Sequence, residues 1–512
     1  MLDATPILRL VTRARVARMQ ALDPAAAQEA LLLRLLRRAR NTTFGREHGF
    51  ATIRGVGEFQ ARVPLRRYED FWRDWWQPAF PALRDVTWPG LVPWFALSSG
   101  TTSGATKYIP VTSGQVAANQ GAALDTLAWH LHAHPRSRPF AGLSFMLGGS
   151  TALQELAPGV RGGDLSGIAA HEVPRFLRSR AWPPEELALM PDWDAKLAAL
   201  AERTPREQMR VLTGTPSWLL VLLHQMARGG APPLPNLELL VHGGVAWPPY
   251  RERITPFLPK GCATREVYPA SEGFVAIADR GEGDGMRLVL DRGCFFEFVP
   301  VAELDTPGPT RHWAATIETG VDYAVVVSSN AGLFAYVLGD VVRFVERTPP
   351  RLLVTGRTAW TLSAFGEHVT GEEVARALDA AAAETGVPIG EWCCGPEFVG
   401  ELGRHRLVIE ADPADPPRLA RAFDAALAVA NEDYAAHRKG GQMLAPEVVL
   451  VPAGRFEAWM RARGKAGGQH KVPRVIADPA RFAEAAAGLA SAGVRVISPS
   501  RSRSPGPAPA RC

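Results

Sequence analysis

Lysine is scarce in this sequence of 512 residues. Of its 57 basic side chains only six are lysines, and the other 51 are arginines. An ammonium is a compact point charge, whereas a guanidinium is a planar fork. A lysine that persists in such a background is therefore a candidate for a position that needs a compact charge. Composition does not distinguish among the six, which are Lys107, Lys196, Lys260, Lys439, Lys465 and Lys471.

Cysteines and long apolar runs are also rare. The five cysteines include no C-x-x-C pair, which argues against a disulfide framework or a structural zinc site. No segment approaches the ~20 apolar residues that a membrane-spanning helix needs. The first twenty residues lack the continuous apolar stretch of a secretory signal. These absences predict a cytoplasmic protein with no membrane partner.

Charge of one sign is not in marked excess either. The chain has 57 basic against 52 acidic residues, a net charge of +5, and its arginines are spread along the sequence. Nucleic-acid binding proteins usually concentrate their positive charge on one face or segment. We therefore expect no nucleic-acid partner. The oligomeric state is not readable from these features.

The order of apolar patterns predicts the fold class. Residues 7–40 repeat apolar positions at helical spacing, and residues 57–96 are rich in tryptophan, which favours a packing layer over an aromatic binding face. From about residue 97 to 300, short apolar runs alternate with longer helical segments, which predicts an α/β fold with a substantially parallel sheet. Residues 286–346 carry short β-rich runs that indicate hairpins or a small barrel-like subdomain.

A domain boundary is expected near Thr348–Pro350. The sequence beyond it predicts a compact α+β unit, with helices over 372–384, 417–438 and 456–463 and strands over 396–399, 406–410 and 447–451. We therefore predict a large N-terminal domain of mixed sheets and helices (1–350), a hinge (351–357), a smaller C-terminal α+β domain (358–490) and a disordered Ser/Pro/Arg tail (498–512).

The strongest chemical signal is the segment Leu97–Lys107. It holds six hydroxyl residues and two glycines before a lysine, between an apolar run and the helix expected from Gly114. Glycines let the backbone approach an anion, hydroxyls and N–H groups donate hydrogen bonds, and an ammonium meets a phosphate as a point charge. The spacing is not that of a Walker A loop. A flexible linker is the alternative, but a linker does not need the lysine.

Four weaker signals follow along the chain. Tyr268 and Glu272 lie in a loop where a ring could stack on a base and a carboxylate could bind Mg²⁺, although an ordinary surface loop fits equally well. Asp340 ends an apolar run, where it would suit ribose hydroxyls or simply form a turn. Gly356-Arg357 fits a hinge with a nearby cation, or a surface turn. The Gly-rich loop 467–474 presents Lys471, or is merely a solvated basic loop.

Taken in order, these motifs resemble those of the adenylate-forming enzymes. More narrowly, they resemble the acyl acid–amido synthetases first known as plant auxin-responsive proteins. The resemblance covers about residues 40–480, and Pro269 departs from the small residues usual in its loop. Its five motifs stand here at Ser98–Lys107, Tyr268–Glu272, Tyr336–Asp340, Gly356–Arg357 and Lys471–Arg474, with supporting matches at Thr43–Phe50, His242–Gly244, Phe365–Glu367, and Asn431 with Tyr434.

The resemblance implies an N-terminal adenylate-forming domain, a mobile C-terminal domain and a reaction in two halves. A carboxylic acid attacks the α-phosphate of Mg²⁺-bound ATP, and an amine, usually of an amino acid, then displaces AMP. The implied catalytic residues are Lys471 and Glu272, with Glu272 also the metal ligand. The implied nucleotide-binding residues are Ser98, Ser99, Gly100, Thr101, Thr102, Ser103, Gly104, Lys107, Gly243, Gly244, Tyr268, Ala270, Ser271, Asp340 and Arg357.

Two other functions remain open at this point. An acyl-CoA ligase shares the first half-reaction and differs in the acceptor, and a nucleotide-binding regulatory protein would keep the fold without making a product. The identities of the acid and the amine are not readable. Apolar residues between about 115 and 225 would wall an acyl pocket or simply form core; they include Trp129, Phe145, Met146, Leu147 and Trp218.

Overall fold

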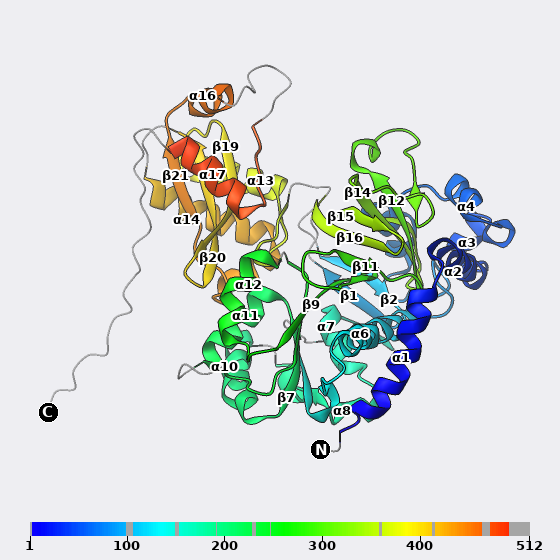
Figure 1. Ribbon diagram of the computed structural model, residues 1–512. Helices are drawn as coiled ribbons and strands as arrows, with labels where there is room; N and C mark the ends of the chain where they lie inside the picture. The colour runs from blue at the N-terminus through cyan, green and yellow to red at the C-terminus, as the bar shows by residue number, and fades with distance from the viewer. Residues whose placement is uncertain are drawn as a thin grey trace. The chain divides into compact units, whose positions relative to one another are not determined.

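The computed structural model describes residues 3–98, 106–148, 153–190, 192–227, 232–245, 247–357, 361–411, 415–462 and 472–490. The chain divides into two units, the first ending at residue 359 and the second beginning at residue 360 (Figure 1). The two units are described separately below. The predicted tail, 498–512, lies outside the described residues.

The first unit begins with two helices whose sequences dictate their ends and buried faces. The Asp23 side chain accepts a hydrogen bond of 2.7 Å from the Ala26 N–H and so caps the second helix. Leucines 31, 32, 35 and 36 are buried at the helical spacing seen in the sequence. The helices of this unit are α1 (Thr5–Ala21), α2 (Pro24–Ala39), α3 (Thr43–Glu47), α4 (Val56–Arg62), α5 (Tyr68–Phe71), α6 (Ser113–Ala133), α7 (Leu165–His171), α8 (Arg175–Arg178), α9 (Glu185–Ala188), α10 (Trp193–Arg203), α11 (Pro216–Met226) and α12 (Pro248–Ile254).

Twelve strands of the described chain join in one sheet, in the order β13-β12-β14-β15-β16-β11-β10-β9-β8-β7-β3-β6. The end that contains β6, β3, β7, β8 and β9 is parallel, as the sequence predicted. The strands are β3 (Leu143–Leu147), β6 (Ala181–Trp182), β7 (Met209–Gly214), β8 (Leu239–His242), β9 (Ala263–Ala270), β10 (Gly273–Ile277), β11 (Met286–Leu288), β12 (Cys294–Pro300), β13 (His312–Trp313), β14 (Asp322–Ser329), β15 (Leu333–Arg347) and β16 (Pro350–Arg357).

Of the two alternatives predicted for residues 286–346, the hairpins are found, since β12, β14, β15 and β16 pair antiparallel in that order, whereas a separate barrel is not formed. Those residues form the antiparallel half of the same twelve-stranded sheet, which continues through β11 into the parallel half. The local pattern of short apolar runs and turns is shared by barrels and by meandering sheets, so it could not show that β11 pairs with β10 on one side and β16 on the other. The predicted hinge residues 351–357 form most of β16, which pairs with β15 and ends just before the boundary between the two units.

A second, four-stranded sheet has the order β2-β1-β5-β4. It comprises β1 (Trp94–Ser98), β2 (Lys107–Val111), β4 (Gln154–Ala157) and β5 (Val160–Gly163). The tryptophan-rich segment before it packs inward, with Trp75, Trp76 and Trp94 buried in the main core. This burial supports the interpretation of that segment as a packing layer.

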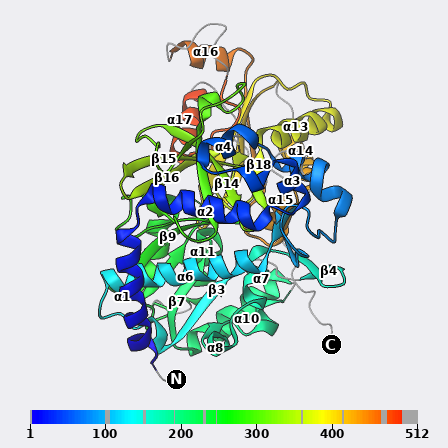
Figure 2. The same cartoon turned by 90° about the vertical axis from the view of Figure 1, so that its right-hand side faces the viewer.

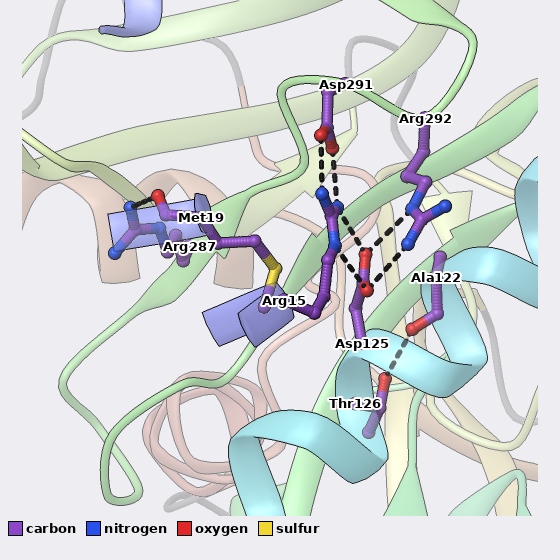
Figure 3. Close-up of polar contacts among 8 residues, drawn as sticks. All are labelled: Arg15, Met19, Ala122, Asp125, Thr126, Arg287, Asp291 and Arg292. Atoms are coloured by element: carbon purple, nitrogen blue, oxygen red, sulfur yellow. Dashed lines mark hydrogen bonds and ion pairs between the residues drawn. The ribbon is translucent and has the colours of Figure 1, made fainter. Parts of the chain in front are cut away.

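Helices α1 and α6 cover one face of the parallel strands. Val16 and Met19 of α1 and Trp129 of α6 pack against Val211 and Val241 of the sheet, and Figure 2 shows α1 crossing the end of α6. An ionic cluster fixes α1 in place (Figure 3).

In that cluster the Arg15 guanidinium donates to both oxygens of Asp125 on α6, at 2.8 Å each, and to both oxygens of Asp291. Arg292 donates to the same two Asp125 oxygens, at 2.8 and 2.7 Å. The charges of the two guanidiniums and the two carboxylates balance. Their bidentate hydrogen bonds join α1, α6 and the segment before β12 (Figure 3).

The second unit is the expected α+β arrangement. It contains β17 (Thr361–Leu362), β18 (Val369–Thr370), α13 (Gly371–Thr385), β19 (Trp392–Val399), β20 (Leu402–Glu410), α14 (Pro416–Ala430), α15 (Glu432–Lys439), β21 (Glu447–Val451), α16 (Arg455–Ala462) and α17 (Pro479–Ala490). The single helix predicted over 417–438 is two helices, because Asn431 is extended and caps α15 by accepting from the Tyr434 N–H at 2.7 Å. Helix α17 was not predicted.

Among the described helices, none combines the length and the apolar character that crossing a lipid bilayer requires.

Candidate functional site

The residues singled out in the sequence meet around one hydrogen bond. Tyr268, on β9, donates its hydroxyl to Asp340 on β15, and both residues are buried, at 8% exposure. Three strands separate β9 from β15 in the sheet order, a distance of about 19 Å if the sheet were flat. The sheet therefore curves between them, so that residues of β9 and β15 approach each other. This bend creates the site.

Asp340 is not at a strand end, as the sequence suggested, but at a bulge inside the fifteen-residue strand β15. Across the ladder with β14, Val337 pairs with Val326 and Val341 with Ala324, so β15 has two extra residues between these pairs. Gly339 lies there with φ of 95°, a left-handed conformation that favours glycine. A bulge re-aims the side chain next to it, which explains why glycine precedes this aspartate.

Glu272 lies in the turn between β9 and β10 and is half-buried. Burial raises the pKa of this carboxyl, and the nearby charge of Asp340 raises it further. The Lys107 ammonium and a hydrogen bond from the Tyr336 hydroxyl act in the opposite direction on the same pKa. Glu272 is thus within electrostatic reach of Asp340 and Lys107, which come from distant parts of the chain.

Lys107 begins β2 and pairs in register with Ser98, the last residue of β1. The hydroxyl-rich segment therefore connects two antiparallel strands, and the expected direct step from strand to helix is wrong: β2 precedes α6. Lys107 Nζ lies 3.4 Å from a carboxylate oxygen of Glu69 and 5.0 Å from the centre of the Tyr68 ring. Ser99, Gly100, Thr101, Thr102, Ser103 and Gly104 lie outside the described residues.

Gly243 and Gly244 follow β8 and adjoin the same edge. A Cβ atom at position 243 would lie 2.2 Å from the Val267 carbonyl oxygen, next to Tyr268, so this position requires glycine. Gly244 has φ of 88° and turns the chain away from the sheet. The glycine pair thus lets β8 end in close contact with β9.

Three of the remaining candidates adjoin residues already described at this site. Ala270 ends β9, Ser271 is in the turn beside Glu272, and both are half-buried. Arg357 is the last residue of β16, and its backbone pairs with that of Asp340. Lys471 lies outside the described residues.

Pro269, the departure from the family pattern, is accommodated within β9. It is exposed and faces Phe274 of β10, and the β9–β10 ladder shifts register immediately beyond this pair. A proline lacks the N–H of a regular ladder and is tolerated at such irregularities. The strand still reaches Ala270, so Pro269 does not displace the neighbouring Tyr268 from Asp340.

Sequence reasoning missed three residues of this cluster. Tyr336 hydrogen-bonds Glu272, and burial raises its own pKa well above the ordinary value; its place in the Tyr336–Asp340 motif was a signal that could have identified it. Tyr68 and Glu69 lie in the cluster because the segment before α5 runs beside β15, where the Arg66 N–H donates to the Ala335 carbonyl at 3.0 Å. No local sequence signal indicates that contact.

The described side chains at this site supply few ligands for a divalent metal. Among the described residues, no group of three or more His, Cys, Asp or Glu side chains is arranged to hold a metal ion. Glu272 and Asp340 nevertheless place two carboxylates within electrostatic reach of each other, a donor set suited to a hard cation that completes its shell with phosphate and water oxygens.

The chain matches three family models in order. It matches the GH3 family N-terminal domain over residues 15–228, the GH3 family central domain over 287–357 and the GH3 family C-terminal domain over 372–480. The chain belongs to the GH3 family. The predicted resemblance is thereby confirmed, and the GH3 central domain corresponds to the antiparallel strands β11–β16 that carry Asp340.

Curated GH3 relatives are similar over part of the chain. Indole-3-acetic acid-amido synthetase GH3.3 of Arabidopsis thaliana is 25% identical over 259 residues, which are 47% of this chain and 43% of that protein. Indole-3-acetic acid-amido synthetase GH3.8 of Oryza sativa subsp. indica is 27% identical over 271 residues, 48% of this chain and 44% of that protein. The alignments thus span less than half of each relative.

Solved structures show that the GH3 fold extends over nearly the whole chain. The GH3.15 acyl acid amido synthetase superposes with a TM-score of 0.57 at 16% identity, covering 95% of this chain and 96% of that one. A 2-hydroxyisobutyryl-CoA ligase, solved with 2-HIB-AMP and CoA in the thioesterification state, gives 0.59 at 17%, covering 93% and 94%. The predicted α/β architecture with a large N-terminal and a smaller C-terminal domain is confirmed.

Proposed function

We propose that this protein is a ligase that activates a carboxylic acid with ATP and transfers the acyl group to the amine of an amino acid, forming an amide. The observation that carries the proposal is that Lys107 of the four-stranded sheet and Asp340 of the twelve-stranded sheet both lie within electrostatic reach of Glu272, in a chain of the GH3 family. The printed names of GH3 relatives, which are amido synthetases, support the amide product.

The chemistry explains why these groups belong together. A carboxylate is a poor electrophile because its negative charge repels nucleophiles, and attachment of AMP removes that charge and supplies a leaving group. Bringing a carboxylate to a triphosphate requires cations and hydrogen-bond donors around the α-phosphate. We assign the segment Ser98–Lys107, with Ser99, Gly100, Thr101, Thr102, Ser103 and Gly104, to the β- and γ-phosphates.

The nucleoside end is assigned to the bend. Asp340 binds the ribose hydroxyls, and the hydrogen bond from Tyr268 fixes the orientation of its carboxylate. The Tyr268 ring and the Gly243–Gly244 backbone flank adenine, with Ala270 and Ser271 beside them, and Arg357 contacts ribose or phosphate. Glu272 is the residue that would hold Mg²⁺, which when bound neutralises phosphate charge. The raised pKa of Glu272 matches a carboxylate placed to receive a cation.

Lys471 is assigned to the first half-reaction, where its ammonium bridges the carboxylate and the α-phosphate. Because the amine must later reach the same carbonyl, the lysine has to leave, which implies rotation of the C-terminal domain near Thr355–Arg357 between the two halves. The location we propose is the cytoplasm, with small-molecule acid and amine as partners and neither nucleic acid nor membrane.

The test is a pyrophosphate-release screen over carboxylic acids with Mg²⁺ and ATP, each with and without a panel of amino acids, products being identified by mass. Acid-dependent pyrophosphate release followed by an amide supports the proposal. A thioester formed with coenzyme A, and no amide, would identify an acyl-CoA ligase. This alternative is tested because the chain shares its fold with the 2-hydroxyisobutyryl-CoA ligase. ATP binding without any product would identify a regulatory nucleotide-binding protein.

A further inference from the structure

A buried histidine stands at the edge of the proposed site without a role in it. His242 is the last residue of β8 and is 1% exposed. Within the described part of the chain, neither of its ring nitrogens has a hydrogen-bond partner. A buried polar group without a partner costs free energy, and such groups in native proteins are uncommon. The structure therefore contains a donor and an acceptor that no described protein group satisfies.

The position of the ring follows from strand geometry. His242 pairs in register with Glu266 of the neighbouring parallel strand β9, and side chains at even offsets on a strand share a face. The His242 side chain thus lies on the same face as Tyr268, two residues beyond Glu266. With standard strand spacings the Cα atoms of His242 and Tyr268 are about 8 Å apart. The His242 imidazole is thus offset by two residues along the strand from Tyr268, whose hydroxyl donates the hydrogen bond that orients Asp340.

The ring is held rigidly. Trp247 stacks on it with ring centroids 3.8 Å apart and planes at 17°, and the Trp247 indole N–H donates to Glu282 at 3.0 Å. Gly243 and Gly244 turn the chain away immediately after His242. Stacking covers a face of the imidazole but leaves the nitrogens on its edge, so the arrangement fixes a hydrogen-bonding edge between apolar residues on the side of β7 and Glu266 on the side of β9, and a few fixed polar groups among apolar ones are what orient a ligand in a pocket.

The state of the ring limits what it would bind. Burial lowers the pKa of His242 to about 3, so the ring is neutral at physiological pH and carries one donor and one acceptor. A neutral imidazole offers no charge to a phosphate or a carboxylate. On the side of β7 and β3, the residues in register with His242 are Gly214 and Leu147, which Leu219 of α11 covers, and on the side of β9 the residue in register is Glu266. An apolar wall beside a neutral polar edge suits an acyl group more than a triphosphate.

We propose that His242 is a specificity-determining residue that hydrogen-bonds an uncharged polar substituent, such as a hydroxyl, on the acyl part of the carboxylic acid. This inference rests on the proposed function and adds the class of acid: one with a hydrogen-bonding group away from its carboxylate. An acid without that group leaves the imidazole unsatisfied, and the site discriminates against it.

The experiment compares matched acids in acid-dependent pyrophosphate release: 4-hydroxyphenylacetate with phenylacetate, 3-hydroxybenzoate with benzoate, and 10-hydroxydecanoate with decanoate. The wild type is expected to favour the hydroxylated member of at least one pair by about 10-fold in kcat/KM. His242→Phe keeps a ring for Trp247 to stack on and should abolish that preference, while the plain acid and the KM for ATP change by less than about threefold. His242→Gln restores a donor and an acceptor and should recover part of the preference.

His130→Phe is the matched control, because His130 is also buried but lies on α6, away from this edge; it should leave the ranking of acids unchanged. Equal use of both members of every pair by the wild type overturns the inference. So does a His242→Phe effect confined to the KM for ATP, which would assign the ring to the nucleotide. Turnover of any plain acid establishes the adenylation itself. Failure of all six acids, together with no thermal stabilisation by MgATP, overturns the proposed function as well.

Discussion

Replacing Asp125 with asparagine should destabilise the first unit strongly. The Asp125 side chain is 2% exposed and its two oxygens accept four hydrogen bonds, two from Arg15 and two from Arg292. Removing one partner of a buried ion pair typically costs about 3–5 kcal/mol, because the remaining charge stays buried without compensation. Arg15 and Arg292 are 16% and 27% exposed, so water relieves part of this cost, and we expect the lower end, about 3 kcal/mol.

The measurement is urea unfolding followed by tryptophan fluorescence, with the midpoint and slope compared between variants. Glu202→Gln is the matched control, because Glu202 forms an ion pair with Arg206 in which both side chains are 71% exposed; its midpoint should not move measurably. The double variant Asp125→Asn with Arg292→Gln restores the charge balance and should recover part of the loss, since the two sites interact directly.

A midpoint for Asp125→Asn that coincides with that of Glu202→Gln would refute the reasoning. It would mean that the four hydrogen bonds in the cluster add nothing to the attachment of α1. A double variant that is less stable than Asp125→Asn by the full cost of the second change would also contradict it, because additive effects indicate that the two sites do not interact.

Three further outcomes follow from the proposed site. Lys471→Ala should lower acid-dependent pyrophosphate exchange by about 10²–10³ while sparing aminolysis of supplied acyl-adenylate, and equal loss in both halves would make this lysine structural. Asp340→Ala should raise the KM for ATP, and an unchanged KM in steady-state kinetics would remove the ribose role. Only the charged form of Glu272 binds a cation, and the pKa of this carboxyl is raised. As the pH is lowered, activity should therefore begin to fall at a pH higher than the ordinary glutamate pKa of about 4.3. Tyr336→Phe removes a hydrogen bond that lowers this pKa, so the acid limb of its pH–rate profile should move to higher pH, and an unmoved limb would contradict that coupling.

The sequence predicted elements better than contacts. The strand over 447–451 and the helices around 372–384 and 456–463 were readable, because their apolar spacing and flanking residues are local. Helix α17 carried signals that were available, since Asp478 caps it by accepting from the Arg481 N–H at 2.8 Å and Pro479 begins it. The break at Asn431 was harder, since it depends on a backbone turn away from the helical region at one residue.

In the candidate site, too, local motifs were predicted and the contacts between distant segments were not. Tyr268, Glu272 and Asp340 were recognised one by one, but their meeting depends on the curvature of the sheet between β9 and β15, which no single motif encodes. For Gly339 and Asp340 the sequence left a strand end and a turn open, and the bulge that the structure shows was not predicted, because a glycine before an aspartate is typical of turns as well. Glu69 and Tyr68 could not be predicted, since the pairing of Arg66 beside β15 joins segments about 270 residues apart.

The charges of the cluster bear on how the proposed site would hold a triphosphate. Within the described residues, the side chains identified around the bend include the carboxylates of Glu69, Glu272 and Asp340 and the one ammonium of Lys107, which already lies beside Glu69. A triphosphate brought here adds further negative charge, so its binding requires additional cations. In the proposed function these are Mg²⁺ and the ammonium of Lys471. If both are needed for the first half-reaction, removal of either one alone should nearly abolish acid-dependent pyrophosphate release, whereas substantial residual release without Lys471 would show that Mg²⁺ and Lys107 suffice.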